Sequence, residues 1–337
     1  MRENTSTEWV NKEVDSEGNF NRQKNQFETP FGEGEGKLPV EPGRYRLLWA
    51  PVCPWAHRSV IVRRFLGLED VISLGTADPK RPDVPRSDWA FTLDEGDVDP
   101  VLGIHYISEA YLAANPDYTG RFTVPALVDI PSGKVVNNDY FNLTLYFETA
   151  WKPYHKEGAP DLYPEDLREE IDKLNDIIFR EVNNGVYKAG FARKQKAYDR
   201  AYNMVFNRLD WLEERLANQR YLFGDRLTES DVRLYVTLVR FDCAYYPVFR
   251  LNKKLLRDYP NLWAYARDLY QIPAFRHNTY FKDFAASVDL NEADEEYWEN
   301  TYYDIVVQET DWDTIWKTPT GRESLSKDPA HKFKAEK

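Results

Sequence analysis

The sequence has few of the features that mark secreted or membrane-spanning proteins. Its 337 residues include only two cysteines, Cys53 and Cys243, which lie far apart, so the chain has no disulfide framework and no zinc-type cysteine spacing. No apolar run approaches the 18 residues of a membrane-spanning helix, and the first residues lack the apolar core of a signal peptide. We therefore expect a protein of the reducing cytoplasm with no membrane partner.

Basic residues are fewer than acidic ones. The chain has 44 lysines and arginines against 56 aspartates and glutamates, which gives a net charge of −12. This balance argues against nucleic acid or an anionic membrane surface as the main partner. The length allows two domains, and a hydrophobic content of 42% is sufficient for a substantial core.

What the sequence does contain is a cysteine in a position suited to chemistry. A strand-like run over residues 44–50 ends shortly before Cys53, and a helical pattern over 54–67 begins with Pro54. Unpaired N–H groups and the dipole at a helix start favour the reactive thiolate. A dithiol oxidoreductase has a second cysteine three residues on, but that residue here is Ala56. Redox chemistry at Cys53 therefore requires a thiol from outside the protein.

The first half of the chain predicts an α/β domain. A second strand begins at 71–74, and the strand–helix–strand order suggests parallel pairing. The elements that follow are a long loop, a helix, a strand and a hairpin return strand, at 77–104, 105–114, 124–130 and 135–136. Asn137, Asn138 and Asp139 can cap the next helix.

The second half predicts helices only, starting at Tyr163. Two long amphipathic helices cover 163–182 and 193–218, and shorter ones end near 241 and span 262–271. Thr228 and Asp231 have the residue types and spacing of a capping box at the start of the third helix.

These patterns divide the chain into four segments. They are an extended arm, an α/β domain, an all-α domain and an acidic aromatic tail, over 1–43, 44–152, 160–286 and 287–337. The arm is expected to lie over the first domain or to be partly mobile. Residues 287–313 contain ten acidic residues and no basic one, but their interleaved tyrosines and tryptophans lead us to expect packing on the body.

The element order, with a Cys-Pro pair at the first helix and Val124-Pro125 before the third strand, is that of a thioredoxin-like domain. In that fold the matching proline is cis and lies opposite the cysteine. The backbone of Val124 could then pair with a cysteinyl peptide as an added strand. An ordinary edge-strand proline is the alternative interpretation.

Six short motifs indicate a particular family with this domain. They are Cys53-Pro54-Trp55-Ala56-His57-Arg58, Gly120-Arg121-Phe122-Thr123-Val124-Pro125, Val136-Asn137-Asn138, the segment 183–192, the segment 220–229, and Asp258-Tyr259-Pro260-Asn261-Leu262-Trp263. With them the chain resembles a glutathione transferase, and more narrowly the Xi-class glutathionyl-hydroquinone reductases. The resemblance covers roughly residues 44–275. It implies a thioredoxin-like domain followed by an all-helical domain, with the site in the crevice between them.

The resemblance implies a thiol-dependent reductase acting on a hydroquinone with a glutathionyl group on its ring. Cys53 would attack the glutathione sulfur, release the hydroquinone and form a mixed disulfide that a second glutathione resolves. No cysteine at position 56 competes with that incoming thiol. A homodimer is also implied. Two alternatives stay open: a general deglutathionylase or thiol transferase, and a non-catalytic scaffold.

The resemblance also implies roles for other residues. Trp89, in the long loop, matches an aromatic residue that covers the bound tripeptide, and Arg121 matches a basic residue that meets a ligand carboxylate. Val124 and Pro125 would supply the backbone pairing. Tyr187 matches a tyrosine that lines the hydroquinone pocket and can donate a hydrogen bond to the developing phenolate. Taken singly, a core tryptophan and a solvated arginine explain Trp89 and Arg121 equally well.

Two candidate residues of the thiol site depart from the family pattern. The family typically has Glu-Ser-Ser after Val136-Asn137-Asn138 to hold the γ-glutamyl group, whereas this sequence has Asp139-Tyr140-Phe141. Asp139 keeps the acid but is shorter, and Tyr140 cannot place its hydroxyl where serine would. A different low-molecular-weight thiol therefore stays open beside glutathione. Cys243 lies in an aromatic helical run and is predicted to be a packed thiol.

Overall fold

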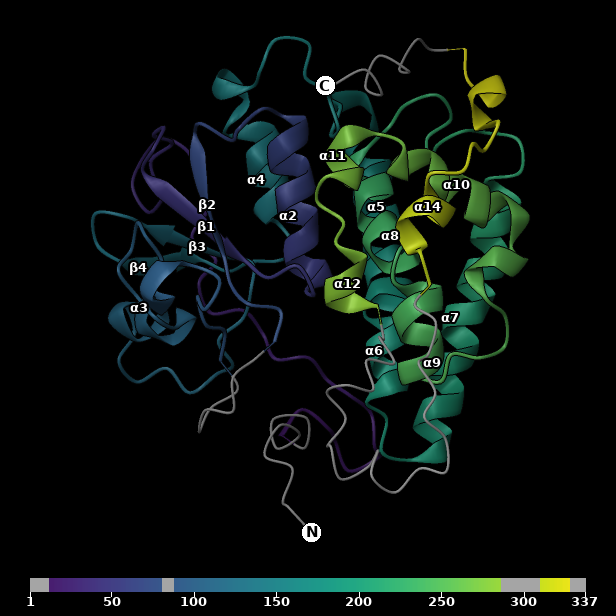
Figure 1. The fold of residues 1–337 in the computed structure, drawn as a ribbon, viewed down its shortest axis with the longest axis horizontal. Helices are drawn as coiled ribbons and strands as arrows, with labels where there is room; N and C mark the ends of the chain where they lie inside the picture. Colours follow the sequence, from purple (N-terminus) through teal and green to yellow (C-terminus); the bar gives the residue numbers. More distant parts are fainter. Residues whose placement is uncertain (1–11, 81–87, 286–309, 328–337) are drawn as a thin grey trace.

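A small sheet lies beside a larger group of helices (Figure 1). The computed structural model describes residues 12–80, 88–285 and 310–327. The sheet and its helices come from the first half of the chain, and the remaining helices come from the second half. The predicted α/β part followed by an all-α part is therefore confirmed.

The sheet has four strands in the order β2-β1-β3-β4. They are β1 (Tyr45–Trp49), β2 (Ile72–Thr76), β3 (Ala126–Asp129) and β4 (Lys134–Asn137). β1 pairs parallel with β2, as the strand–helix–strand order predicts, while β3 is antiparallel to both β1 and β4. Every residue of β1 is buried, so this strand forms the centre of the domain and ends next to Cys53.

Helix α2 (Pro54–Phe65) lies where the two halves of the molecule meet. It packs on α4 (Leu143–Thr149) of its own domain and on α8 (Glu229–Leu238) of the helical part, as Figure 1 shows. Eleven of its twelve residues are buried, because neighbours cover it on both sides. The third helix of this domain, α3 (Ile107–Ala114), packs on β4.

The predicted cap of the helix after β4 is wrong by several residues. α4 begins at Leu143, and the carboxylate of Asp139 instead accepts hydrogen bonds from the backbone N–H groups of Phe141 and Asn142, at 3.1 and 3.2 Å. A short acidic side chain can bind nearby backbone groups in a turn rather than start a helix, which explains the delay.

The helical part contains the elements that form the other side of the crevice. They are α5 (Arg168–Ile178), α6 (Gly185–Gly190), α7 (Gln195–Arg215), α8, α9 (Tyr246–Val248), α10 (Pro260–Tyr270), α11 (Pro273–Arg276) and α12 (Phe281–Phe284). The capping box at the start of α8 is present, because Thr228 and Asp231 bond reciprocally. This local prediction is confirmed.

The first long helix is shorter than predicted. α5 starts at Arg168 rather than 163, and residues Phe179–Asn183 form one π-helical turn before α6 begins. A π turn holds one extra residue and often marks a functional site. Here it shifts the rotation of α6, the helix that carries Tyr187. The helix predicted to end near 241 ends at Leu238, where a second π segment follows.

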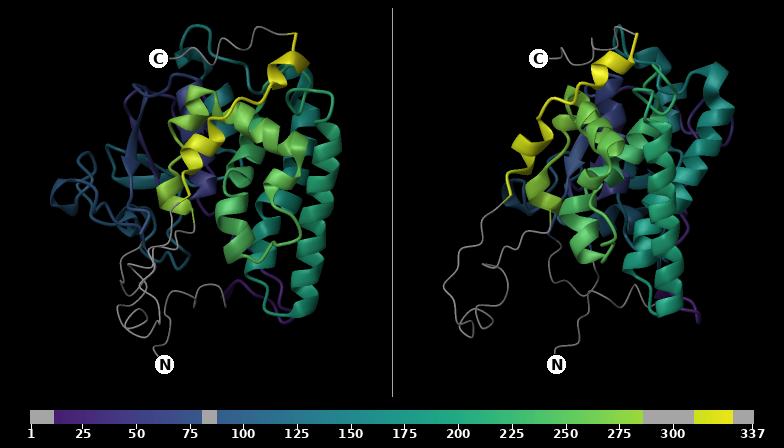
Figure 2. Two further views of the ribbon diagram at one scale, coloured as in Figure 1. Left: turned by 45° about the vertical axis from the view of Figure 1, so that its right-hand side comes forward. Right: turned by 90° about the vertical axis from the view of Figure 1, so that its right-hand side faces the viewer.

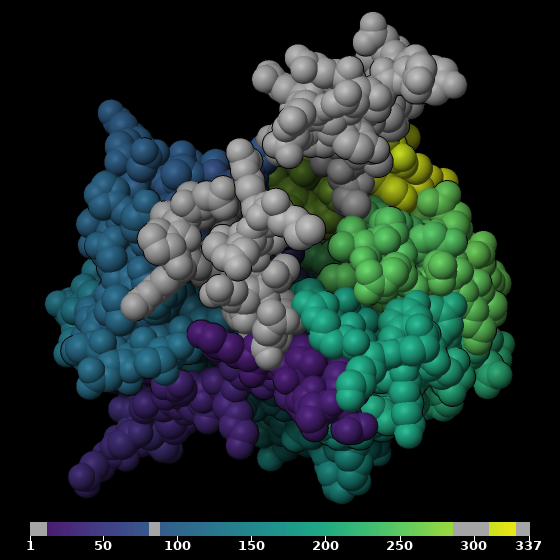
Figure 3. Space-filling view, turned by 90° about the horizontal axis from the view of Figure 1, so that it is seen from below, coloured from purple at the N-terminus to yellow at the C-terminus, as the bar shows by residue number. Residues whose placement is uncertain are grey.

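The described part of the arm contacts both domains, not only the first as we expected. Figure 3 shows its residues running from the sheet domain to the helical part. On the side of the sheet domain, Phe27 N donates to Asn138 Oδ1 at 3.2 Å, and Asn138 N donates to Phe27 O at 2.8 Å. On the other side, Arg193 N donates to Gly18 O at 3.0 Å and Lys194 Nζ donates to Ser16 O. The arm therefore bridges the crevice.

The end of the described chain packs on the helical part. α14 (Trp312–Trp316) runs along it in both views of Figure 2. Trp316 is buried against Trp263, with ring centroids 5.1 Å apart, and Trp312 stacks on Phe281. The packing predicted for 287–313 thus holds for Trp312, whereas Thr310 and Asp311 are exposed, and residues 287–309 lie outside the described residues.

Candidate active site

Cys53 lies between β1 and α2, at the N-cap of the helix. Its carbonyl accepts the first helical hydrogen bond from His57 N at 3.0 Å, and Pro54 is the first helical residue. A proline suits that position because its missing N–H has no partner in a helix anyway. Cys53 is partly exposed, and the first N–H groups of the helix that follows it have no carbonyl partner within α2. The structure thus gives Cys53 the helix-start location that the sequence predicts.

The cis proline lies directly opposite the thiol. The Val124–Pro125 peptide bond is cis, as the resemblance implies, and Cys53 Sγ donates to the Val124 carbonyl at 3.3 Å. This hydrogen bond requires the S–H proton, so it belongs to the neutral thiol. Ionisation would release the Val124 carbonyl to a ligand. The predicted pairing of a thiol ligand with Val124 remains a prediction, now with the groups in place.

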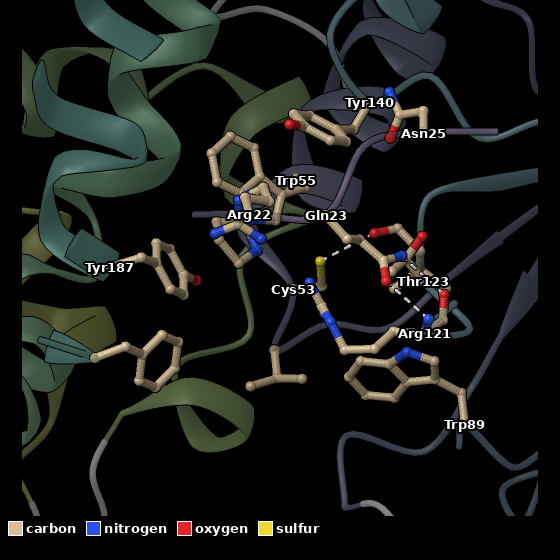
Figure 4. A pocket seen from close by; sticks show the side chains of 14 residues that line it. Arg22, Gln23, Asn25, Cys53, Trp55, Trp89, Arg121, Thr123, Tyr140 and Tyr187 are labelled. Carbon is tan, nitrogen blue, oxygen red and sulfur yellow. Dashed lines mark hydrogen bonds between the residues drawn. The ribbon is translucent and has the colours of Figure 1, made fainter. Parts of the chain in front are cut away.

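A pocket opens at Cys53, and most of the predicted site residues line it (Figure 4). Its wall consists of Arg22, Gln23, Asn25, Val52, Cys53, Pro54, Trp55, Trp89, Arg121, Thr123, Val124, Tyr140, Tyr187 and Phe191. Two predicted residues, Pro125 and Asp139, are not part of this wall. The pocket is therefore formed by the arm, the sheet domain and the helical domain together.

One side of the pocket carries the residues assigned to the thiol. The indole of Trp89 is 4% exposed, and Trp89 N donates to Asp88 Oδ1 at 2.7 Å. Arg121 binds the carboxylate of Glu13 through Nε and Nη2, at 2.8 and 3.2 Å. A two-pronged pair of this kind is the geometry in which a guanidinium holds any carboxylate. The assignment of Arg121 to a ligand carboxylate stays a prediction, and Glu13 occupies its guanidinium here.

The two residues that depart from the family pattern lie in different places. Asp139 belongs to its own turn, with Oδ2 accepting from Asn142 Nδ2 at 2.7 Å and Oδ1 accepting from Asn25 Nδ2 at 3.2 Å. Tyr140 points its ring into the pocket, where the ring centroid lies 5.1 Å from that of Trp55. Burial raises the pKa of the Tyr140 hydroxyl, so the phenol stays neutral. Tyr140 thus offers an aromatic surface where the family pattern has a serine.

The other side of the pocket is aromatic. Tyr187, from α6, packs near Trp55 and Phe249, with ring centroids 5.9 and 5.3 Å away. Its hydroxyl lies 3.4 Å from the hydroxyl of Tyr245, and burial raises the pKa of both phenols. Both therefore stay protonated and able to donate a hydrogen bond. The chain has 22 tyrosines, and no sequence motif singles out Tyr245 among them.

The residues of the arm that line the pocket were not predicted from the sequence. Gln23 forms two hydrogen bonds with the backbone of Arg121, as donor from Nε2 at 3.1 Å and as acceptor at Oε1 at 2.8 Å. Arg22 and Asn25 line the pocket on either side of it. A polar, glycine-rich arm carries no local pattern that indicates where it will dock, so no signal in the sequence could have found these residues.

The two basic residues after Cys53 in sequence point away from it. His57 is fully buried, and Arg240 Nη1 lies 2.9 Å from its Nδ1, which must therefore accept the bond because an arginine can only donate. Burial and Arg240 together hold the pKa of His57 well below its usual range. Arg58 is buried too, and its guanidinium has no hydrogen-bond partner among the described residues. The side chains of both residues are thus buried and are not part of the pocket wall that contains Cys53.

The second cysteine is structural. Cys243 is 5% exposed, its Sγ donates to the Val239 carbonyl at 3.5 Å, and burial raises its pKa to about 12. This agrees with the predicted packed thiol. Among the described residues, no group of three or more His, Cys, Asp or Glu side chains is placed to hold a metal. Nor is any of the helices described here long and apolar enough to span a membrane.

Two family models match this chain. The glutathione S-transferase N-terminal domain matches residues 52–150 and the C-terminal domain matches residues 195–268. A curated relative, the glutathionyl-hydroquinone reductase PcpF of Sphingobium chlorophenolicum, is 40% identical over 250 residues, which are 73% of this chain and 77% of the relative. The chain belongs to the glutathione transferases.

Solved structures agree with this membership. The Xi glutathione transferase of Phanerochaete chrysosporium is 41% identical, with a TM-score of 0.75 and coverage of 80% of this chain and 87% of that one. The glutathione-bound transferase homologue YqjG of Escherichia coli K-12 is 36% identical, with a TM-score of 0.73 and coverage of 88% and 93%. The family and fold that the motifs of this transferase implied are therefore confirmed.

Proposed function

We propose that this transferase is a thiol-dependent reductase that removes glutathione from glutathionyl-hydroquinones through a mixed disulfide on Cys53. The observation that supports it is the position of the Cys53 thiol at the mouth of a pocket with the Val124 carbonyl on one side and Tyr187 on the other. Two relatives, 40% and 39% identical to this chain, carry the name of this activity.

The reaction needs one protein thiol and two molecules of the small thiol. The Cys53 sulfur bonds to the glutathione sulfur while the bond between that sulfur and the ring carbon breaks. Before this, a proton moves from a ring hydroxyl to the ring carbon that carries the sulfur. When the carbon–sulfur bond breaks, its electrons pass to that ring oxygen, and the resulting phenolate takes up a proton as the hydroquinone leaves. A second glutathione thiolate then attacks the mixed disulfide, which releases glutathione disulfide and restores Cys53. Two glutathione sulfurs are oxidised to the disulfide, and the ring carbon is reduced.

The absence of a second accessible thiol favours this route. Ala56 occupies the position of a resolving cysteine, and Cys243 is buried. The mixed disulfide must therefore wait for a thiol from solution. Tyr187 faces the space next to Cys53 and can donate to a ring oxygen as negative charge develops on it. Trp89, Arg121, Val124 and Tyr140 would hold the tripeptide.

The proposal extends to the oligomeric state, the compartment, the co-substrate and the domain limits, which rest on the family resemblance and on the residues of the chain. We propose a homodimer in the cytoplasm, with glutathione as the co-substrate and the domain limits 44–152 and 160–286. The two free cysteines suit a reducing compartment. Light scattering coupled to size-exclusion chromatography would measure the dimer.

A single-turnover experiment tests the central step. The protein is mixed with an equimolar amount of a glutathionyl-hydroquinone, without free glutathione, and its intact mass is measured. We expect one glutathione adduct on the wild type and on Cys243→Ser, and none on Cys53→Ser. With free glutathione present, Cys53→Ser should release no hydroquinone. Turnover by Cys53→Ser at the wild-type rate would overturn the proposal.

A further inference from the structure

The aromatic half of the pocket contains one positive charge, the guanidinium of Arg22. It lies 4.6 Å from the ring centroid of Trp55 and 4.8 Å from that of Tyr187. Figure 4 shows Arg22 beside Trp55, on the same side of Cys53 as Tyr187, while Thr123, Arg121 and Trp89 lie on the other side. The Arg22 guanidinium is therefore part of the aromatic half, away from the residues assigned to the thiol.

The arm fixes Arg22 from both sides. Its next neighbour, Gln23, is tied to the Arg121 backbone by two hydrogen bonds. Two residues before it, Phe20 is buried against Phe191 of the helical part, with ring centroids 5.2 Å apart. Arg22 Nε donates to Asn184 Oδ1 at 2.9 Å. The guanidinium thus has a defined place, as a residue that recognises a ligand requires.

The charge of Arg22 has no anionic partner in the part of the chain that the structure describes. Among the described residues no carboxylate is within ion-pair distance of it, and Asn184 is a neutral amide. Its Nη2 atom is buried and has no hydrogen-bond partner in the described ranges of the chain. Removing a cation from water without an anion is costly, and stacking on two rings offsets only part of that cost. A guanidinium in this state has donors ready for an anion that enters the pocket.

We propose that Arg22 is the anion-binding residue of the aromatic half and that it binds a negatively charged oxygen carried by the aromatic substrate. The inference rests on the proposed function, because it takes the ring to occupy the space beside Tyr187. Two sources share this chemistry: a ring oxygen that becomes negative as the carbon–sulfur bond breaks, and an acidic group attached to the ring. The first would make Arg22 act on the rate, and the second would make it act on substrate choice.

The first experiment measures binding and needs no turnover. Calorimetry on the full chain compares hydroquinone, which is neutral, with 2,5-dihydroxybenzoate, the same ring with a carboxylate. If the acidic group is the anion, the wild type binds the acid about tenfold more tightly, and Arg22→Gln abolishes this preference. Arg22→Lys should keep part of it. Lys24→Gln, an exposed cation in the same arm, is the matched control and should change nothing.

The second experiment measures turnover of a neutral glutathionyl-hydroquinone. If the ring oxygen is the anion, Arg22→Gln lowers kcat about tenfold and leaves the KM for free glutathione unchanged. If Arg22→Gln instead disturbed the structure in general, the melting temperature would fall and kcat and both KM values would change together. Arg22→Lys would then not restore them.

The outcomes separate this inference from the proposed function. If the wild type does not turn over any glutathionyl-hydroquinone, the proposed reaction fails and the binding comparison still tests Arg22. The inference is overturned if Arg22→Gln leaves both the ring preference and kcat unchanged. It is also overturned if the only change is a higher KM for glutathione, because Arg22 would then bind the thiol.

Discussion

The carboxylate of Glu13 in the arm lies against the guanidinium of Arg121 in the sheet domain, with both oxygens bonded at 2.8 and 3.2 Å. The two side chains are largely buried, at 9% and 17% exposure. Glu13 therefore presents to Arg121 the same group that a tripeptide ligand would present. Arm and ligand compete for one guanidinium if Arg121 has the role that the family resemblance implies.

Replacing Glu13 by Gln should release Arg121. The amide cannot form a charge-assisted pair, so we expect the KM for glutathione to fall about three- to tenfold, with little change in kcat. Steady-state kinetics at varied glutathione concentration measure this. Glu17→Gln, an exposed acid in the same arm, is the control. A KM that rises in Glu13→Gln would mean that the arm contact organises the thiol site instead of competing for it.

Replacing Tyr187 by Phe should slow the release of the hydroquinone. The variant keeps the ring that packs near Trp55 and Phe249 but removes the hydroxyl that would donate to the developing phenolate. The expected loss in kcat is roughly ten- to a hundredfold, with the KM for glutathione unchanged. Tyr163→Phe, which removes a hydroxyl bonded to Asp172, is the control. An effect confined to glutathione binding would contradict the role of Tyr187.

Protein stability should fall in mild acid because of His57. Its pKa is lowered in the folded protein by burial and by Arg240, so the folded state keeps the imidazole neutral while the unfolded chain protonates it. The unfolded state then binds more protons, and stability is lost as the pH falls below about 6.5. The loss due to this group approaches about 1.4 kcal/mol for each further pH unit, until the folded pKa is reached.

Urea unfolding at several values between pH 7.5 and 5.5 checks the contribution of His57. His57→Asn keeps an oxygen that can accept from Arg240 but cannot be protonated in this range, so its stability should depend less on pH than that of the wild type. His105→Asn replaces an exposed histidine and should keep the wild-type slope. Equal slopes for all three proteins would show that His57 does not account for the pH dependence.

The parts of the fold that follow local rules could be predicted from the sequence. Cys53 and Pro54 signal a helix start by their own residue types, and the structure has the helix there. The capping box of Thr228 and Asp231 is equally local. The sequence did not predict the later start of α4. Asp139 can either cap a helix or bind backbone N–H groups in a turn, and the structure has the turn.

The parts of the site that depend on distant contacts could not be predicted. Gln23 bonds to Arg121 across 98 residues, and Arg22 bonds to Asn184 across 162. No periodicity in the arm encodes such contacts, since they depend on the shape of two finished domains. The place of Tyr245 in the site could not be predicted either, because only the fold brings its hydroxyl close to that of Tyr187.

Replacing Asp231 by Ala should destabilise the helical part strongly. Its buried carboxylate accepts from Leu222 N at 2.9 Å, Thr228 N at 2.8 Å and the Tyr265 hydroxyl at 2.7 Å, and the variant would leave these donors without an acceptor. We expect a loss of about 3 kcal/mol in the free energy of unfolding. Asp166→Ala removes an exposed partner of Arg226 and should cost far less stability, because water screens that ion pair. If chemical denaturation found the two variants equally stable, the network around Asp231 would not be what fixes the start of α8.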